Sequence, residues 1–512
     1  MRTLEVVVIG AGVGGIALAA RLARQGARVT VFEKNEGPGG RCDRWVWEGH
    51  RFDTGPTLLL MLEIFAETYA ELGERLEDHL TLQRVDPTYL VHFEDGTVLQ
   101  MTADLPTMRD QLEALEPGSF TAFLRYLADG HRFYEVARRE FIGRNFRHWW
   151  EYFSPARLPL LLQLRALTAH YQDVGRYFRD PRLRAAFTFQ DMYLGLSPFE
   201  APATYALLAA SELTQGVWFP RGGMYRIAES LTAIAEGYGV RFHYHTPVTA
   251  IEVDGDRATG VRLEGGERVR ADLVVANADL PYVYRHLLPP GPEAEAMARL
   301  RYTCSAITFY WGLRKSLPDL WAHNVFLAGD YRKSFEQIFR DLRLPEEPSF
   351  YVHAPARLDP DAAPPGEDTV MVLVPTGHLP ADGRPPEDLQ AMVERARAAV
   401  EARLARALGR PLGPLRKFER VYTPHTWQTR YHLERGAAFG LSHTFAQVGY
   451  LRPANRHPRY RNLYFVGAST HPGTGLPIVL LSARLTAQRI VEEWAAWFAA
   501  RRYPVPRASA TA

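Results

Sequence analysis

The pattern of hydrophobic and polar positions near the N-terminus predicts a strand, a helix and a second strand in close succession. Val6–Ile9 is a β-branched run typical of a strand buried on both faces. Apolar residues then recur at helical spacing up to Gly26, where a glycine can end the helix, and Val29–Phe32 is a second strand-like run. This order predicts an α/β protein that opens with a Rossmann-like unit.

The loop between the first strand and the helix has the spacing G-x-G-x-x-G, at Gly10, Gly12 and Gly15, with Gly14 inside it. These glycines suit a tight turn, close approach of backbone to a pyrophosphate, and close packing of helix on strand. Glu33 ends the second strand 23 residues after Gly10, where a carboxylate can accept hydrogen bonds from an adenosine ribose. The combination predicts dinucleotide binding. The alternative is a glycine-rich turn without a ligand.

A second strand–loop–helix unit lies near the C-terminus. Leu463–Val466 has the pattern of a buried strand, an apolar helix is expected from Ile478 to about Trp494, and a loop rich in glycine and proline joins them. Such a loop is stiff and can direct backbone amides toward a ring system or a phosphate. Cofactor contacts are therefore expected from Gly467, Ala468, Gly475, Leu476 and Pro477.

Two further glycine clusters follow Glu33, at residues 37–41 and 53–56. Their close spacing favours backbone packed against a ligand over two ordinary surface turns. The guanidinium of Arg41 also suits a pyrophosphate, because its fork of N–H groups matches phosphate oxygens. We expect further cofactor contacts from Gly40, Arg41, Gly55 and Pro56, and from Val248, where a later predicted strand begins.

The middle of the chain alternates between helical and strand-like patterns. Tyr89–Phe93 and Val98–Met101 predict a hairpin, residues 120–213 are mainly helical, and residues 302–448 mix strands with helices. The last of four strand-like runs ends in residues 277–279, where a strand terminus would face a cofactor. The four runs are 241–244, 248–253, 260–263 and 269–276.

Residues 138–164 combine arginines, Trp, Tyr and Phe side chains, and a short leucine run. This is the composition of a segment that lies in a membrane interface, where aromatic rings and long basic side chains reach from apolar to wet surroundings. The alternative is a core-facing helix with a solvated arginine face. We predict peripheral membrane contact through this segment.

The bulk composition narrows the classes of protein. The 512 residues are 46% hydrophobic and 23% charged, which is ordinary for a folded chain of two or three domains. A net charge of +2 gives no global field toward nucleic acid. Cys42 and Cys304 have no metal-like spacing, and neither a signal peptide nor a spanning helix is expected. We expect a cytoplasmic protein without a metal site, whose tail after Pro504 is disordered.

Beyond the opening motif, several stretches together resemble the bacterial and fungal phytoene desaturases, almost from end to end. The C-terminal stretch is the most specific, since flavin amine oxidases share the others more loosely. Ser469 and Ile478 stand where the family commonly has glycine, a difference that bears on which carotenoid is processed. The matching stretches are 39–41, 53–56, 193–207, 216–224 and 462–477.

The resemblance implies noncovalent FAD and a hydrophobic polyene substrate, phytoene or a related carotenoid, taken from the inner face of the cell membrane. A hydride would pass from an allylic C–H to the flavin, with oxygen or a quinone as the final electron acceptor. The implied domains are discontinuous. FAD-binding segments at 1–85, 216–300 and 451–500 would alternate with a helical, membrane-associating segment at 86–215 and a mixed α+β substrate domain at 301–450, before the tail at 501–512.

No residue is predicted as the catalytic acid or base. His471, Asp279, Glu200 and Arg221 lie in the relevant loops, but each such residue is more often structural. Other activities stay open: action on a hydroxy-, methoxy- or C30 carotenoid as desaturase, ketolase or saturase; amine or protoporphyrinogen oxidation on the same scaffold; and a non-catalytic lipid carrier resembling the GDP-dissociation inhibitors.

Overall fold

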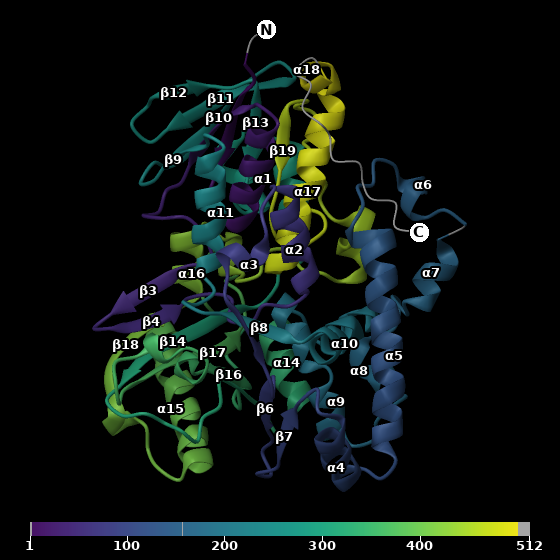
Figure 1. Cartoon of the computed structure of the whole chain (residues 1–512), viewed down its shortest axis with the longest axis vertical. Helices are drawn as coiled ribbons and strands as arrows, with labels where there is room; N and C mark the ends of the chain where they lie inside the picture. The colour runs from purple at the N-terminus through teal and green to yellow at the C-terminus, as the bar shows by residue number, and fades with distance from the viewer. Residues whose placement is uncertain (1–2, 156, 500–512) are drawn as a thin grey trace.

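A five-stranded parallel sheet forms the upper part of the molecule in Figure 1, the computed structural model, which describes residues 3–155 and 157–499. The opening unit is confirmed as β1 (Glu5–Ile9), α1 (Val13–Arg24) and β2 (Arg28–Phe32). The predicted disordered tail lies outside the described residues. The other three strands come from distant parts of the chain, in the order β19 (Leu463–Phe465), β13 (Leu273–Ala276), β1, β2 and β9 (Arg241–His243).

Helices cover one face of this sheet and a small antiparallel sheet covers the other (Figure 1). The helices are α1, α11 (Arg226–Gly237) and α17 (Leu476–Glu493), the last confirming the predicted C-terminal helix. The small sheet consists of β10 (Val248–Asp254), β11 (Arg257–Leu263) and β12 (Arg268–Arg270).

The single strand predicted over 269–276 is wrong. It is two strands in two sheets, because β12 ends at Arg270 and β13 begins at Leu273. Between them the chain crosses from the small sheet to the five-stranded sheet, where the Asp272 N–H donates to the carbonyl of Glu5 over 2.8 Å. Hydrophobic patterning runs unbroken through this crossing, so it carries no sign of the change of sheet.

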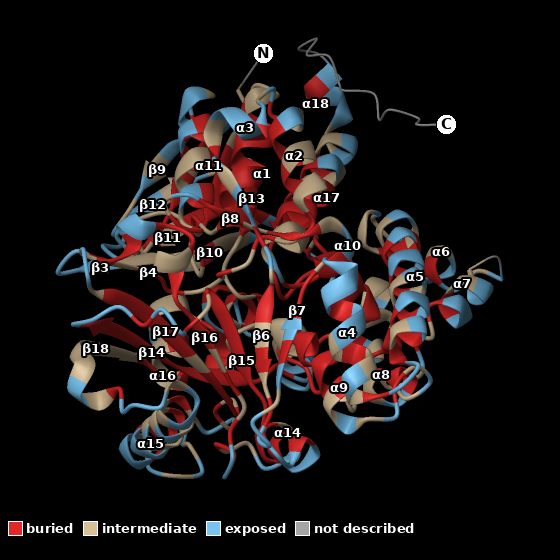
Figure 2. Ribbon diagram, turned by 60° about the horizontal axis from the view of Figure 1, so that its bottom comes forward, coloured by how far each residue is buried: buried red, intermediate tan, exposed pale blue. Residues whose placement is uncertain are grey.

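A seven-stranded mixed sheet forms the lower part of the molecule, with α15 (Leu389–Leu408) packed on one face (Figures 1 and 2). The predicted hairpin is confirmed as β6 (Tyr89–His92) and β7 (Val98–Met101). It joins the edge of this sheet through a parallel pairing of β6 with β15, although the sequence grouped it with the helical segment 86–215. The order is β18 (Arg416–Tyr422), β14 (Ser305–Leu313), β17 (Asp368–Thr376), β16 (Phe350–His353), β15 (His323–Phe326), β6 and β7.

Most of residues 120–213 are helical, as predicted, and with α4 before them they form the right side of Figure 1. No helix among the described residues is both long and apolar enough to cross a bilayer. These helices are α4 (Leu105–Leu115), α5 (Ser119–Ala137), α6 (Trp149–Tyr152), α7 (Leu158–Gln163), α8 (His170–Val174), α9 (Pro181–Ala186) and α10 (Ala206–Gln215).

Shorter elements connect these parts. Two small ribbons pair β3 (Arg44–Trp47) with β4 (His50–Asp53) and β5 (Leu82–Val85) with β8 (Val217–Pro220). The remaining α-helices are α2 (Leu62–Glu71), α3 (Leu76–His79), α12 (Leu280–Tyr282), α13 (Pro292–Ala298), α14 (Tyr331–Phe339), α16 (Pro424–Tyr431) and α18 (Ala495–Ala499).

Candidate cofactor site

A cleft lies at the carboxyl ends of β1, β2 and β13, where α1 and α17 begin. In open parallel sheets this edge is the usual place for a ligand, because the loops that follow the strands converge there. Ten residues predicted to contact a cofactor line this cleft although they come from five separate segments. They are Gly10, Gly12, Gly14, Glu33, Gly40, Arg41, Val248, Gly467, Ala468 and Leu476.

The glycine loop is shaped around Asn277, the residue after β13. A Cβ on Gly12 would lie 2.6 Å from Asn277 Oδ1, and a Cβ on Gly15 would lie 2.8 Å from the same oxygen. The Asn277 side chain is fixed by donating from Nδ2 to the carbonyl of Val466 over 2.9 Å, so it ties the first glycine loop to the second. Only glycine leaves room here, and the backbone of the loop stays open to the cleft.

Glu33 is 6% exposed and faces the cleft from the end of β2. Its carboxylate accepts the N–H of Ala11 at Oε2 over 2.8 Å and the N–H of Asn35 at Oε1 over 2.9 Å. A carboxylate oxygen can accept more than one hydrogen bond, so both oxygens keep capacity for ribose hydroxyls. The Gly39 N–H donates to the carbonyl of Ala11, which brings the second glycine cluster beside the first.

The other end of the cleft is built from Arg41, Asp279 and Ser469. Ser469 Oγ donates to Asp279 Oδ1 over 2.5 Å and accepts the N–H of Leu441 over 3.1 Å. Burial raises the pKa of the Asp279 carboxyl, which hydrogen bonds from Ser469 and the Glu434 N–H oppose. The sequence marks Asp279 as a candidate, but it marks Ser469 only as a departure from the family pattern. No sequence signal indicates that Ser469 connects its own loop to those of Asp279 and Leu441.

Five predicted residues are not among those that line the cleft: Gly15, Gly55, Pro56, Gly475 and Pro477. Gly15 packs against Gly10, because a Cβ on Gly15 would lie 2.5 Å from the Gly10 carbonyl oxygen. Gly55 lies behind Arg41, whose carbonyl oxygen occupies the place of a Cβ. Gly475 precedes α17 with φ +104°, a left-handed conformation that favours glycine. Gly15 and Gly55 thus pack against the backbone of residues that line the cleft.

The candidate acid–base residues are dispersed. His471 is buried, and its Nε2–H donates to the Arg144 carbonyl over 2.7 Å. Burial lowers the pKa of His471 to about 4, so the ring is neutral at physiological pH. Glu200 pairs with Arg301 at 2.5 Å and Arg221 lies 3.9 Å from Asp361, both among exposed side chains. Of the four, Asp279 alone lines the cleft.

The cleft fits a dinucleotide with a ring system. The first turn of α1 and the start of α17 both line it, so two helix N-termini present N–H groups and positive dipole ends to a bound anion. The glycine loop after β1 leaves space that a Cβ would fill, and Glu33 follows β2, the neighbouring strand of the sheet. Among the described residues no group of His, Cys, Asp and Glu could hold a metal ion.

Comparison with known proteins places the chain. Residues 13–491 match the family of flavin-containing amine oxidoreductases. A zeta-carotene-forming phytoene desaturase of Myxococcus xanthus is 48% identical over 96% of this chain and 94% of its own. A phytoene desaturase of Neurospora crassa is 45% identical over 96% and 85%. A 4,4'-diapophytoene desaturase of Staphylococcus haemolyticus is 36% identical over 96% and 99%. The fold matches an oxidoreductase from Methanosarcina mazei with a TM-score of 0.63, at 19% identity over 96% and 100% of the two chains.

Proposed function

The chain belongs to the family of flavin-containing amine oxidoreductases, and from that membership we propose that it is an FAD-dependent carotenoid desaturase that acts on phytoene. The observation that carries the proposal is the match, over 96% of the chain, to relatives named phytoene desaturase. The cleft supports it, because the loop that resembles these enzymes most specifically lines the same cavity as the dinucleotide motif.

We assign the two ends of FAD to the two ends of the cleft. Glu33 would hold the adenosine ribose, and the N–H groups of α1 with the loop around Gly12 would hold the pyrophosphate. The loop Gly467–Leu476 and Arg41 would hold the ring system. The FAD-binding part would then comprise segments 1–85, 216–300 and 451–500. All three contribute to the five-stranded sheet: 1–85 gives β1 and β2, 216–300 gives β9 and β13, and 451–500 gives β19.

Bound FAD would supply a hydride acceptor for an allylic C–H of the polyene, loss of a proton from the neighbouring carbon would complete the double bond, and oxygen or a quinone would take the electrons onward. The chain itself must hold the reacting carbon within about 3 to 3.5 Å of the acceptor and exclude water. A hydrocarbon offers no charge to recognise, so this alignment depends on apolar contacts. The cleft contributes Leu433 and Leu476, whose side chains lie at its ring-binding end.

Expression in a phytoene-accumulating host, followed by pigment analysis, tests the proposal. We expect the host to turn yellow to red as conjugated double bonds are added. A host that expresses the flavin-loaded protein and keeps only colourless phytoene would contradict phytoene as substrate. Supplying purified protein with hydroxy-, methoxy- and C30 carotenoids would then separate the other desaturases, and ketolase or saturase products would be read from the same chromatograms.

The C30 alternative has a specific observation in its favour, the 36% identity to a 4,4'-diapophytoene desaturase. Amine or protoporphyrinogen oxidation is less supported, because the structural likeness to other oxidoreductases is at 19% identity and shows the fold alone. A lipid carrier would not need the flavin cleft. A purified protein without flavin absorbance would favour that reading.

We also propose that the surface around α6 and α7 binds the inner face of the cell membrane. Six of the twelve exposed large hydrophobic side chains of the described residues lie between positions 149 and 167, where Figure 2 shows α6 and α7 at the rim of the molecule. Exposed basic side chains at Arg139, Arg144 and Arg147 adjoin them. The six are Trp149, Trp150, Phe153, Leu158, Leu162 and Leu167.

Changing Trp149, Trp150, Leu158 and Leu162 together to Ser should strongly reduce co-sedimentation with anionic liposomes while FAD stays bound. Leu161 is unsuitable because it is buried at 8% exposure, although its neighbour Leu162 is 63% exposed. The matched control is Val46→Ser with Trp47→Ser, two exposed apolar residues on the β3–β4 hairpin at the opposite side of Figure 1. Equal co-sedimentation of both variants would show that α6 and α7 have no special role in membrane binding.

A further inference from the structure

Arg452 is a buried arginine whose guanidinium is bonded to backbone carbonyls alone. Its side chain is 2% exposed, and all five N–H groups of the guanidinium have acceptors. The acceptors are the carbonyls of Thr470 (3.1 Å), Ser442 (2.9 Å), Gln447 (3.0 Å), Leu441 (3.3 Å) and Ala468 (2.5 Å).

In the part of the chain that the structure describes, Arg452 forms no ion pair. Burial lowers the pKa of the guanidinium to about 10, which still leaves it charged at neutral pH. The two neighbouring histidines, His443 and His471, carry no charge at neutral pH, because burial and the nearby Arg452 lower the pKa of both. The carboxyl of Asp279 acts on Arg452 through space, without a direct ion pair. A buried charge that is not ion-paired is costly, and this cost is only partly offset here.

Two of the five carbonyls that Arg452 holds belong to the loop at the ring-binding end of the cleft. Ala468 lines the cleft, and Thr470 follows it in the same loop. Arg41 also lines this end and donates to the Ala438 carbonyl over 2.8 Å, while Asp279 is the carboxylate there. This end of the cleft therefore lies between two guanidinium groups and one carboxyl group, next to the positive N-terminus of α17.

We propose that Arg452 is a positioning residue that clamps the loop 467–470 and supplies a positive charge, not ion-paired among the described residues, for a reduced, negatively charged flavin ring. The inference rests on the proposed function only in requiring that flavin binds with its ring at this loop. Hydride transfer moves one proton and two electrons from a substrate carbon, so it adds one negative charge to the oxidant. A fixed cation in a water-poor site stabilises such a charge more strongly than water does.

The test measures the midpoint potential of the bound flavin in the purified holoprotein. Arg452→Gln removes the charge but keeps hydrogen-bond donors. At a fixed ambient potential, the ratio of reduced to oxidised flavin should fall by about tenfold, and the reduced form should protonate at higher pH, as its absorbance shows. Arg357→Gln is the matched control, since Arg357 is only 14% exposed, lies in the seven-stranded sheet region away from the cleft, and is paired with Asp368. Its potential should equal that of the wild type.

Arg452→Lys keeps the test decisive if the Gln variant does not fold. A buried lysine readily loses its charge, so a plot of flavin potential against pH should bend downward as the amine deprotonates, whereas the wild-type plot does not. A flavin-loaded Gln variant with wild-type potential, or a Lys plot parallel to the wild-type plot, overturns the inference. Neither result touches the proposed function, which fails only if the wild-type protein binds no flavin or desaturates no carotenoid.

Discussion

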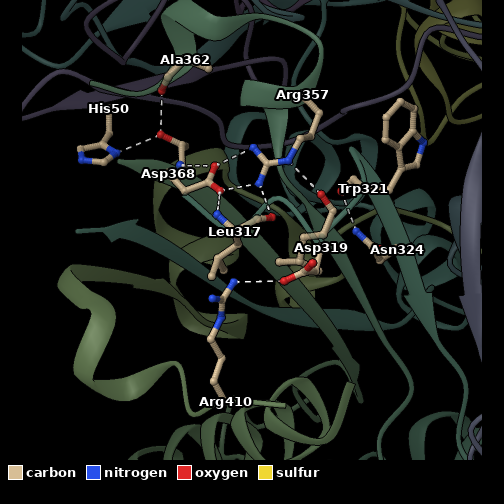
Figure 3. A network of polar contacts seen from close by, with 11 residues as sticks. His50, Leu317, Asp319, Trp321, Asn324, Arg357, Ala362, Asp368 and Arg410 are labelled. Atoms are coloured by element: carbon tan, nitrogen blue, oxygen red, sulfur yellow. Dashed lines mark hydrogen bonds and ion pairs between the residues drawn. The ribbon is translucent and has the colours of Figure 1, made fainter. Parts of the chain in front are cut away.

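Two arginines, one partly exposed and one buried, show how differently the chain treats charge in its two main regions. In the seven-stranded sheet region, Arg357 donates from Nη2 to Asp368 Oδ2 over 2.5 Å and also to the carbonyls of Leu317 and Leu320 (Figure 3). Beside the cleft, Arg452 donates to five carbonyls and has no carboxylate partner among the described residues. Removing one partner of the Arg357–Asp368 pair would leave an unpaired charge in the fold, whereas the charge of Arg452 is not ion-paired and can act on a ligand through space.

The largest effect is expected from blocking the cleft at its glycine loop while leaving the seven-stranded sheet region unchanged. Gly12→Val would place a Cβ 2.6 Å from Asn277 Oδ1 and a branched side chain where pyrophosphate must approach. We expect nearly complete loss of flavin from the purified protein. The control is Gly237→Val at the end of α11, where nothing lies within 4 Å of the added Cβ. A yellow, fully loaded Gly12→Val protein would show that this loop is not the phosphate site.

Breaking the ion pair between Arg357 and Asp368 should lower the stability of the protein without changing cofactor binding. Arg357→Met leaves the fully buried carboxylate of Asp368 without its cation, which should lower the free energy of unfolding by about 3–5 kcal/mol. Flavin content and potential should not change. Arg410→Met is the control in the same network, because Arg410 is 43% exposed and pairs with Asp319 at 3.2 Å, and should cost about 1 kcal/mol or less. Equal losses in both variants would contradict the distinction.

Glu212 on α10 is a buried carboxyl that also has no cation, so it tests whether such groups are costly away from the cleft. Burial raises the pKa of Glu212 to about 7 from 4.5, although it accepts the Tyr89 hydroxyl over 2.9 Å. The folded protein therefore prefers the protonated form. Stability from this group is complete below pH 4.5 and is lost as the pH rises through 7, by about 3 kcal/mol.

Glu212→Gln should remove this dependence, because the amide keeps an acceptor for Tyr89 and does not ionise. Denaturant unfolding of both proteins at pH 5 and pH 8 measures it: the wild type should lose stability relative to the variant at the higher pH. Glu200→Gln, at an exposed and paired carboxylate, serves as control. Parallel pH profiles for the wild type and Glu212→Gln would mean that Glu212 ionises freely in the folded state.

The smallest effect concerns the joint beside Arg452. Ser469→Ala leaves the buried Leu441 N–H without its acceptor and Asp279 without one donor. We expect a loss of about 1–2 kcal/mol in the free energy of unfolding, with flavin still bound. Thermal unfolding of the holoprotein with parallel flavin quantification measures both. Loss of flavin at unchanged stability would instead place Ser469 in direct contact with the cofactor.

Local pattern determined much of the nucleotide-binding half. The strand, glycine loop, helix and second strand from Val6 to Glu33 form where the sequence predicts them, because each depends on neighbours within a few residues. The second loop, at residues 467–477, was found for the same reason. Its residues Gly467, Ala468 and Leu476 line the cleft as expected, whereas Gly475 and Pro477 are not among the lining residues.

Only the tertiary structure decided which distant groups meet. Asn277 packs against the first glycine loop although it follows a strand more than 250 positions later in the chain. Likewise, β6 joins a sheet made mostly of residues 305–422. Exposure also depends on packing, since Leu161 is buried and Leu162 is not. The sequence shows that an arginine stands at position 452. That its five donors meet carbonyls and no carboxylate follows from the arrangement of three loops, which no local pattern encodes.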